Sequence, residues 1–88
     1  PIAGVYIVRV EFEGKNYGGI ANMGTRPTVG GQNPVLEIHL LEFSGNLYGK
    51  KISVEFLKKV RDEKKFDGLD QLKDQIFKDI SSAREYFS

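Results

Sequence analysis

The chain has 88 residues, of which 40% are hydrophobic and 28% are charged, a composition typical of one small folded domain and not of a disordered chain. The formal net charge of +1 provides no strong field for nucleic acid or an anionic membrane, so neither is expected as a partner. The lack of cysteine and the single His exclude disulfides, thiolate metal sites and multi-histidine centres. No run approaches the roughly 18 apolar residues of a membrane span, and no signal peptide pattern is present, so a cytoplasmic location is expected.

A first strand is predicted over residues 5–12, where apolar residues alternate with polar ones. Val8, Val10 and Phe12 fall on one face of this strand and predict a contact with the core. Residues 13–16 follow as a hairpin turn, in which a glycine supplies the positive φ that such turns require.

A second strand is predicted over residues 17–23, and it contains the adjacent glycines Gly18 and Gly19. Glycines within a strand indicate either a sharp bend or another group that approaches the backbone closely. Residues 22–34 are rich in Gly, Thr, Pro and Asn and predict a loop. This loop is too long for a tight turn, so it is a candidate functional loop.

A third strand is predicted over residues 35–43, with apolar residues on both faces and Glu37 among them. An ionised carboxylate is costly to surround with apolar groups, so Glu37 is a candidate functional acid. From these residues alone, however, a carboxylate that pairs with a lysine at the rim of the sheet is the favoured interpretation, because structural ion pairs are common. His39 shares the face of Glu37, but side chains two apart on a strand need not touch, so we interpret His39 as structural.

A fourth strand over residues 51–59 and a charged connector over residues 61–66 precede a predicted helix. Asp67 is placed to cap this helix, and Asp70 favours the positive end of its dipole. The apolar stripe that predicts the helix consists of Leu69, Leu72, Ile76, Ile80, Ala83 and Phe87. The residues assigned to its polar surface are Lys73, Asp74, Lys78, Asp79 and Glu85. These patterns predict a β-barrel with one helix docked against it.

Five motifs, in order along the chain, resemble the riboflavin kinase family, and most of all the C-terminal kinase module of bacterial bifunctional riboflavin kinase/FMN adenylyltransferases. They are Gly4-Val5-Tyr6, Asn22-Met23-Gly24-Thr25-Arg26-Pro27-Thr28, Glu37-Ile38-His39-Leu40-Leu41, Leu47-Tyr48-Gly49-Lys50, and the run from Leu57 to Phe66. The resemblance implies one riboflavin kinase domain over residues 1–88. It also implies a mainly β fold, a closed antiparallel Greek-key β-barrel of about six strands with one C-terminal α-helix.

The resemblance implies roles for particular residues. Glu37 takes the position of the catalytic base that receives the proton of the riboflavin hydroxyl. The positions that hold the flavin are matched by Arg61, Lys64 and Phe66. The nucleotide side is matched by Leu40, Glu42 and Tyr48, and a flap loop over the site is matched by Asn22, Gly24, Thr25 and Arg26. The other lysines nearby are interpreted as solvated surface.

The implied reaction is transfer of the γ-phosphoryl group of ATP to the 5′-hydroxyl of riboflavin, which gives FMN for FMN and FAD biosynthesis. Mg²⁺ is the implied cofactor, and ATP, ADP, riboflavin and FMN are the implied small-molecule partners. The family's Pro-Thr-Ala-Asn segment, which binds the metal and the phosphates, is expected upstream of Pro1. No metal ligand is therefore expected in this chain, and the isolated 88 residues are expected to be inactive or weakly active. An FMN adenylyltransferase domain is expected on the N-terminal side in the parent chain.

Two other functions are consistent with parts of the sequence. One is a flavin-binding module without catalysis, which would keep the flavin cleft alone. The other, less favoured, is a small barrel that binds single-stranded nucleic acid; the near-neutral charge and the lack of interleaved Arg and aromatic residues argue against it. Residues 25–31 look suited to phosphate, but they lack the strand-to-helix context of a P-loop.

Overall fold

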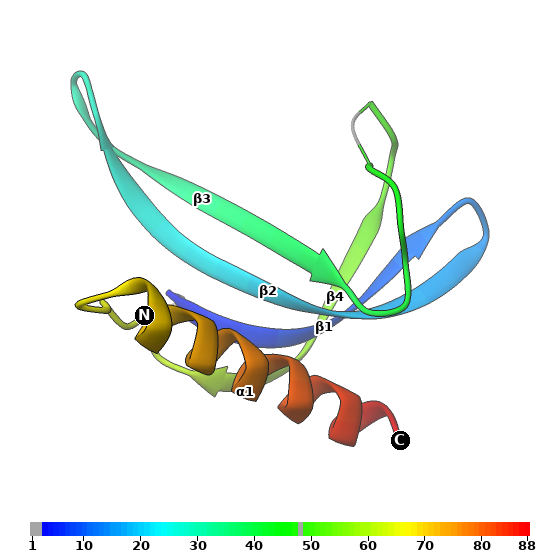
Figure 1. The fold of residues 1–88 in the computed structure, drawn as a ribbon. Helices are drawn as coiled ribbons and strands as arrows, with labels where there is room; N and C mark the ends of the chain where they lie inside the picture. The colour runs from blue at the N-terminus through cyan, green and yellow to red at the C-terminus, as the bar shows by residue number, and fades with distance from the viewer. Residues whose placement is uncertain (1–2, 48) are drawn as a thin grey trace.

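The computed structural model describes residues 3–47 and 49–88, apart from the side chains of residues 26–28. Figure 1 shows one curved antiparallel sheet with a helix across one of its faces. The elements are β1 (Gly4–Phe12), β2 (Lys15–Thr28), β3 (Gly31–Leu40), β4 (Ser53–Arg61) and α1 (Leu69–Phe87), and the strand order in the sheet is β3-β2-β1-β4. The described part of the chain has no helix with the length and apolar character that a membrane crossing requires.

The strand order matches a Greek key, because three strands follow one another through hairpins and the fourth returns beside the first. The prediction of a mainly β fold with one C-terminal helix is confirmed. The predicted closed barrel is not, because β3 and β4 are the two edges of the sheet and no pairing between described residues joins them. The link between these edges contains no strand in its described residues 41–47 and 49–52, and its apolar side chains cover one face of the sheet instead.

The central strand β1 is buried on the predicted face and, at its beginning, on the opposite face as well. Val8 and Val10 are fully buried on the face that the 41–52 link covers, and Val5 and Ile7 are buried on the face toward α1. Burial of each of these valines contributes about 1.5 kcal/mol to the free energy of unfolding, relative to an exposed valine. The turn predicted over residues 13–16 is found but is shorter, since residues 13 and 14 both have positive φ and β2 begins at Lys15.

The predicted loop over residues 22–34 is wrong, because most of this segment is a β-hairpin. β2 continues to Thr28 and β3 begins at Gly31, with Asn22 opposite Glu37 and the pairing continuous to the turn. Proline suggests a loop, but a hairpin at the edge of a sheet accepts it where no ladder hydrogen bond is lost. In Figure 1 this hairpin extends well beyond the rest of the sheet.

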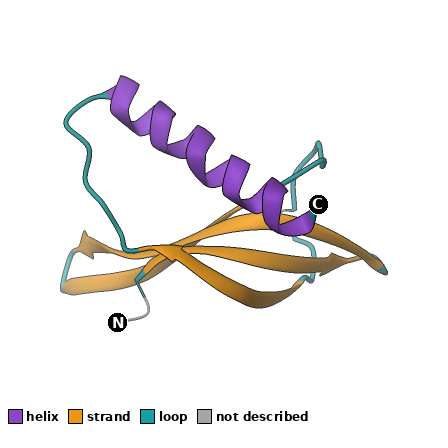
Figure 2. Cartoon of the chain, turned by 90° about the horizontal axis from the view of Figure 1, so that it is seen from below, coloured by secondary structure: helices purple, strands orange, loops and turns teal. Residues whose placement is uncertain are grey.

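Helix α1 is docked mainly through its C-terminal half. Ala83 is completely buried against the sheet and Ile80 is half-buried, whereas Leu69 and Ile76 in the N-terminal half are 71% and 45% exposed. Figure 2 shows the helix crossing the sheet obliquely and approaching it at its C-terminal end. The apolar side chains in the N-terminal half of α1 are therefore not packed closely against the sheet and remain exposed.

The predicted helix start is right within one residue, but the predicted cap is wrong. The N-cap residue is Gly68, with extended backbone and no capping side chain. Asp67 precedes this cap residue, and its backbone N–H donates a hydrogen bond to the Gln71 side chain, at 3.3 Å. Asp70 lies in the first turn as predicted, where its charge favours the helix dipole.

Candidate functional site

A cleft of about 550 Å³ lies between the open N-terminal half of α1, the connector after β4 and the edge strand β3. We call it the helix cleft. Its lining includes Glu37, Arg61, Lys64 and Phe66, together with Asn22 from the predicted flap. The fold therefore brings the predicted catalytic residue and all three predicted flavin-binding residues into one cavity.

Strand register explains why Glu37 reaches this cleft. Glu37 stands opposite Asn22, and the pair Ile20 and His39 stands two residues along, so all four side chains leave the sheet on the face toward α1. Glu37 and His39 are both exposed, and both line the cleft. The expectation that Glu37 is enclosed by apolar groups is wrong, because β3 is an edge strand that α1 leaves uncovered.

A second carboxylate, Glu63, also lines the helix cleft, and sequence reasoning did not single it out. Its carboxylate lies against Gly24 of β2 so closely that a side chain at position 24 would collide with it. Glu37 and Glu63 both border a smaller hollow of about 90 Å³ at the base of the hairpin. The sequence contained no signal for this contact, because Gly24 fell in the predicted loop and not in a predicted strand.

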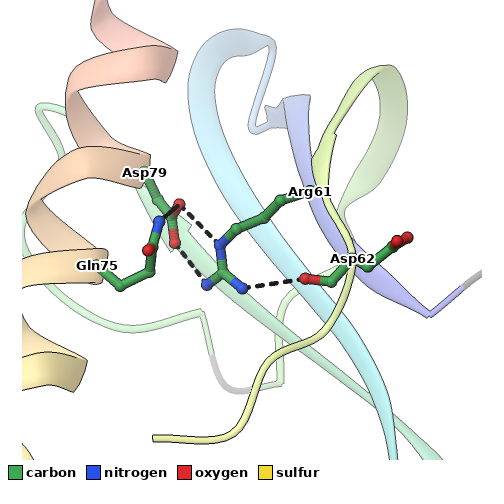
Figure 3. A network of polar contacts seen from close by, with 4 residues as sticks. All are labelled: Arg61, Asp62, Gln75 and Asp79. Carbon is green, nitrogen blue, oxygen red and sulfur yellow. Dashed lines mark hydrogen bonds and ion pairs between the residues drawn. The ribbon is translucent and has the colours of Figure 1, made fainter.

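The cation of Arg61 is fixed by a buried carboxylate from α1, as Figure 3 shows. Arg61 Nε donates to Asp79 Oδ1 at 3.1 Å, and Arg61 Nη2 donates to Asp79 Oδ2 at 2.9 Å. Gln75 Nε2 donates to the same Oδ1 at 3.1 Å. Asp79 is only 6% exposed, so its assignment to the polar surface of the helix is wrong. Its spacing from Ile76 and Ala83, at three and four residues, was the signal for a shared helix face.

The aromatic ring of Phe66 lies close to two cations. Arg61 Cζ is 5.9 Å and Lys64 Nζ is 5.5 Å from the ring centroid, distances at which a cation is attracted to an aromatic face. Lys64 is exposed, whereas Arg61 is held by Asp79. The two predicted flavin-binding cations therefore differ in their freedom to move.

The connector begins with an exposed ion pair. Lys59 Nζ lies 2.8 Å from Asp62 Oδ1. This hydrogen bond lowers the pKa of Asp62 and raises the pKa of Lys59. The backbone carbonyl of Asp62 also accepts a hydrogen bond from Arg61 Nη1, at 3.1 Å. The start of the connector is thus held from two sides.

Two of the residues predicted for the nucleotide side, Leu40 and Glu42, do not line the helix cleft. Leu40 is buried in the sheet and lines a hollow of about 590 Å³ with Phe43 and Leu47. Glu42 is exposed, has a positive φ of 56°, and borders a different hollow, where its carboxylate lies 4.0 Å from Arg84. Tyr48 lies outside the described residues.

The predicted flap residues lie on β2 in the long hairpin. Thr25 borders the small hollow at the base of the hairpin with Asn22 and Gly24, and its hydroxyl donates to Gln32 Oε1 at 3.4 Å. The side chain of Arg26 lies outside the described residues.

No metal centre is found in the part of the chain that the structure describes, where no three His, Cys, Asp or Glu side chains group closely enough to hold an ion. The described residues therefore contain no cluster of three such ligands for the Mg²⁺ expected with ATP.

The riboflavin kinase family model matches residues 1–87. Three relatives are named bifunctional riboflavin kinase/FMN adenylyltransferase. The protein from Escherichia coli K12 is 50% identical over 99% of this chain, that from Haemophilus influenzae is 48% identical over 100%, and that from Bacillus subtilis is 40% identical over 100%. The chain spans 28%, 29% and 29% of these relatives, less than a third of their length.

One solved structure, titled as a macrolide-efflux protein from Streptococcus pneumoniae, has the same fold. Its TM-score is 0.88 at 36% identity, and the alignment covers 96% of this chain and 28% of that one. Its title differs in subject from the names of the curated relatives. Since the family model matches residues 1–87 and the sequence relatives agree with it, the chain belongs to the riboflavin kinase family.

Proposed function

We propose that this chain is a riboflavin kinase domain that transfers the γ-phosphoryl group of ATP to the 5′-hydroxyl of riboflavin, giving FMN and ADP. The family match supports the reaction. The observation that carries the assignment of residues is the meeting of Glu37, Arg61, Lys64 and Phe66 in the helix cleft, although they come from an edge strand, the end of β4 and the connector.

In this proposal Glu37 is the catalytic base. Phosphoryl transfer depends mainly on positioning and on charge stabilisation, and a carboxylate orients the attacking oxygen. As the hydroxyl oxygen bonds to the γ-phosphorus and the bond to ADP breaks, the hydroxyl proton passes to Glu37. The exposure of Glu37 on an uncovered edge strand supports this role, because a sugar-alcohol chain and a nucleotide must both reach it from solvent.

The flavin ring is proposed to lie against Phe66 and the open stripe of α1. Leu72 and Ile76 line the cleft, so the apolar side chains that α1 leaves uncovered provide a wall for an aromatic ring system. Lys64 is exposed and is free to leave the Phe66 ring when a flavin approaches, whereas Arg61 stays in place beside Asp79. The positive charges of Arg61 and Lys64 would then attract the electron-rich groups of the bound flavin.

The ATP side is proposed at the hollow that Leu40 lines, with Glu42 and Tyr48 nearby in the chain. The hairpin residues Asn22, Gly24, Thr25 and Arg26 are proposed as the flap. Mg²⁺ is proposed to act with ATP, with ligands not assigned to the described residues. The names of the curated relatives support an FMN adenylyltransferase domain elsewhere in the same polypeptide.

The test is FMN formation by the purified complete gene product with riboflavin, ATP and Mg²⁺, followed by chromatography with fluorescence detection. We expect FMN in proportion to time and enzyme, and none when ADP replaces ATP. Riboflavin binding without FMN formation would instead support a flavin-binding module without catalysis. If riboflavin is neither bound nor phosphorylated, the proposal is wrong.

A further inference from the structure

Arg61 and Asp79 join the two walls of the helix cleft. Arg61 is the last residue of β4, and Asp79 lies in the middle of α1. Their side chains are 21% and 8% exposed and make two parallel hydrogen bonds, the geometry in which an arginine–carboxylate pair is strongest and most directional. Gln75, one turn earlier on the helix, holds the same carboxylate (Figure 3).

Stability alone is a weak reason for this arrangement. Desolvation of two charges offsets much of their attraction, and apolar residues of similar volume often serve a fold equally well. Such residues would suit this place, since Ile76, Ile80 and Ala83 lie on the same helix face. A buried carboxylate that faces the guanidinium in two-point contact instead specifies one orientation of Arg61.

That orientation is set inside the cleft. Arg61, Asp79 and Phe66 all line it, and Arg61 lies near the Phe66 ring while its Nη1 donates to the carbonyl of Asp62 at the start of the connector. One guanidinium therefore links β4, the connector and α1. The part of α1 that precedes Asp79 is otherwise weakly held, because its apolar residues Leu69 and Ile76 are exposed.

We infer that Asp79 is a positioning residue for flavin binding: through Arg61 it fixes the cation and the connector that carries Phe66 against the wall formed by α1. Asp79 does not itself contact the flavin in this scheme. The inference rests on the proposed function, because it takes the helix cleft as the flavin site.

The test compares Asp79→Asn, Arg61→Lys and the double variant in the complete gene product, with Asp74→Asn on the exposed surface of α1 as the control. Riboflavin affinity is measured by flavin fluorescence quenching, and steady-state kinetics give KM and kcat. Thermal unfolding identifies a temperature at which every variant is folded. We expect Asp79→Asn to raise the Kd and KM for riboflavin about tenfold, equal to about 1.4 kcal/mol, with kcat within about twofold. Asp74→Asn should match the original protein.

The double variant separates a positioning role from an independent one. If Asp79 acts through Arg61, the double variant binds riboflavin no more weakly than Arg61→Lys does. Additive losses, or an unchanged Kd in a folded Asp79→Asn protein, would overturn the inference. If Asp79→Asn does not fold, Gln75→Leu removes only the supporting hydrogen bond and should raise the Kd about two- to threefold; no change there also counts against it. Failure of the original protein to bind riboflavin would instead refute the proposed function.

Discussion

The ring of Phe87, at the end of α1, lies against Gly18 of β2 so closely that a Cβ at position 18 would stand 2.6 Å from the ring atom Cε2. The neighbouring Gly19 is crowded from another direction, since a Cβ there would stand 2.7 Å from the backbone oxygen of His39 on β3. The two adjacent glycines of β2 thus serve two different contacts. Gly18 leaves room for the end of α1 to pack against the sheet, and Gly19 leaves room for the backbone of β3.

The two glycines should respond differently to substitution by alanine. At Gly18 the new methyl group meets the end of a side chain that is itself 36% exposed and is able to shift. At Gly19 it meets backbone, which can move only by distorting the β2–β3 ladder. We expect Gly19→Ala to lower the free energy of unfolding by about 2–3 kcal/mol and Gly18→Ala by about 1 kcal/mol. Urea unfolding of both variants measures this, and equal losses would contradict the difference in contacts.

The sequence predicted the features that depend on local pattern. Alternation placed Val8, Val10 and Phe12 on one buried face, and glycine placed the first hairpin turn. Gly18 and Gly19 predicted either a sharp bend or a close approach to the backbone, and the structure shows a close approach at both. These features follow from side-chain period and backbone freedom, which a sequence contains directly.

The features that the sequence missed depend on tertiary context. The proline- and glycine-rich segment 22–34 has a loop composition but forms a hairpin, because pairing at a sheet edge overrides composition. Asp79 is charged, so pattern alone placed it on the surface, although Arg61 from a distant strand makes its burial possible. Glu37 was expected among apolar groups, but the tilt of α1 leaves it exposed. In each case the deciding contact is with a segment that lies elsewhere in the chain.

Substitution of Glu37 by Gln should impair catalysis more than binding. The amide keeps the shape of the side chain but cannot accept the hydroxyl proton, and loss of a general base costs about a hundredfold or more in kcat. Riboflavin affinity should change by less than about threefold, because Arg61, Lys64 and Phe66 are not altered. Kinetics of FMN formation and fluorescence titration measure the two effects. Glu11→Gln, at an exposed residue of β1, is the control, and a Glu37→Gln protein with full kcat would remove Glu37 as the base.

Phe66 should contribute to flavin affinity through its ring. An aromatic pair is worth about 1 kcal/mol beyond the area that it buries, so Phe66→Leu is expected to raise the riboflavin Kd about fivefold. Phe77→Leu is the matched control, because Phe77 is 69% exposed on α1 and does not line the helix cleft. Flavin fluorescence quenching measures both variants. Equal affinities for Phe66→Leu and Phe77→Leu would show that the ring does not contact the flavin.

The exposed ion pair between Lys59 and Asp62, at the start of the connector, should shift the pKa values of both side chains. Its hydrogen bond lowers the pKa of Asp62 below the ordinary 3.8 and raises the pKa of Lys59 above the ordinary 10.5. The contribution of Asp62 to stability is therefore complete above pH 3.8 and lost as the pH falls through its lowered pKa. That of Lys59 is complete below pH 10.5 and lost as the pH rises through its raised pKa.

Titration of the Asp62 carboxyl carbon by NMR checks this pair directly. Lys59→Met should return the pKa of Asp62 toward its ordinary value, because the hydrogen bond that favours the ionised carboxylate is gone. Lys58→Met is the control, since the neighbouring lysine is exposed and lines a different part of the surface. An Asp62 pKa that is the same in Lys59→Met as in the original protein would show that the pair does not form in solution. The start of the connector would then be held only by the hydrogen bond from Arg61 to the Asp62 carbonyl among the contacts described above. Because Asp79 orients Arg61, the position of the connector would depend more strongly on Asp79.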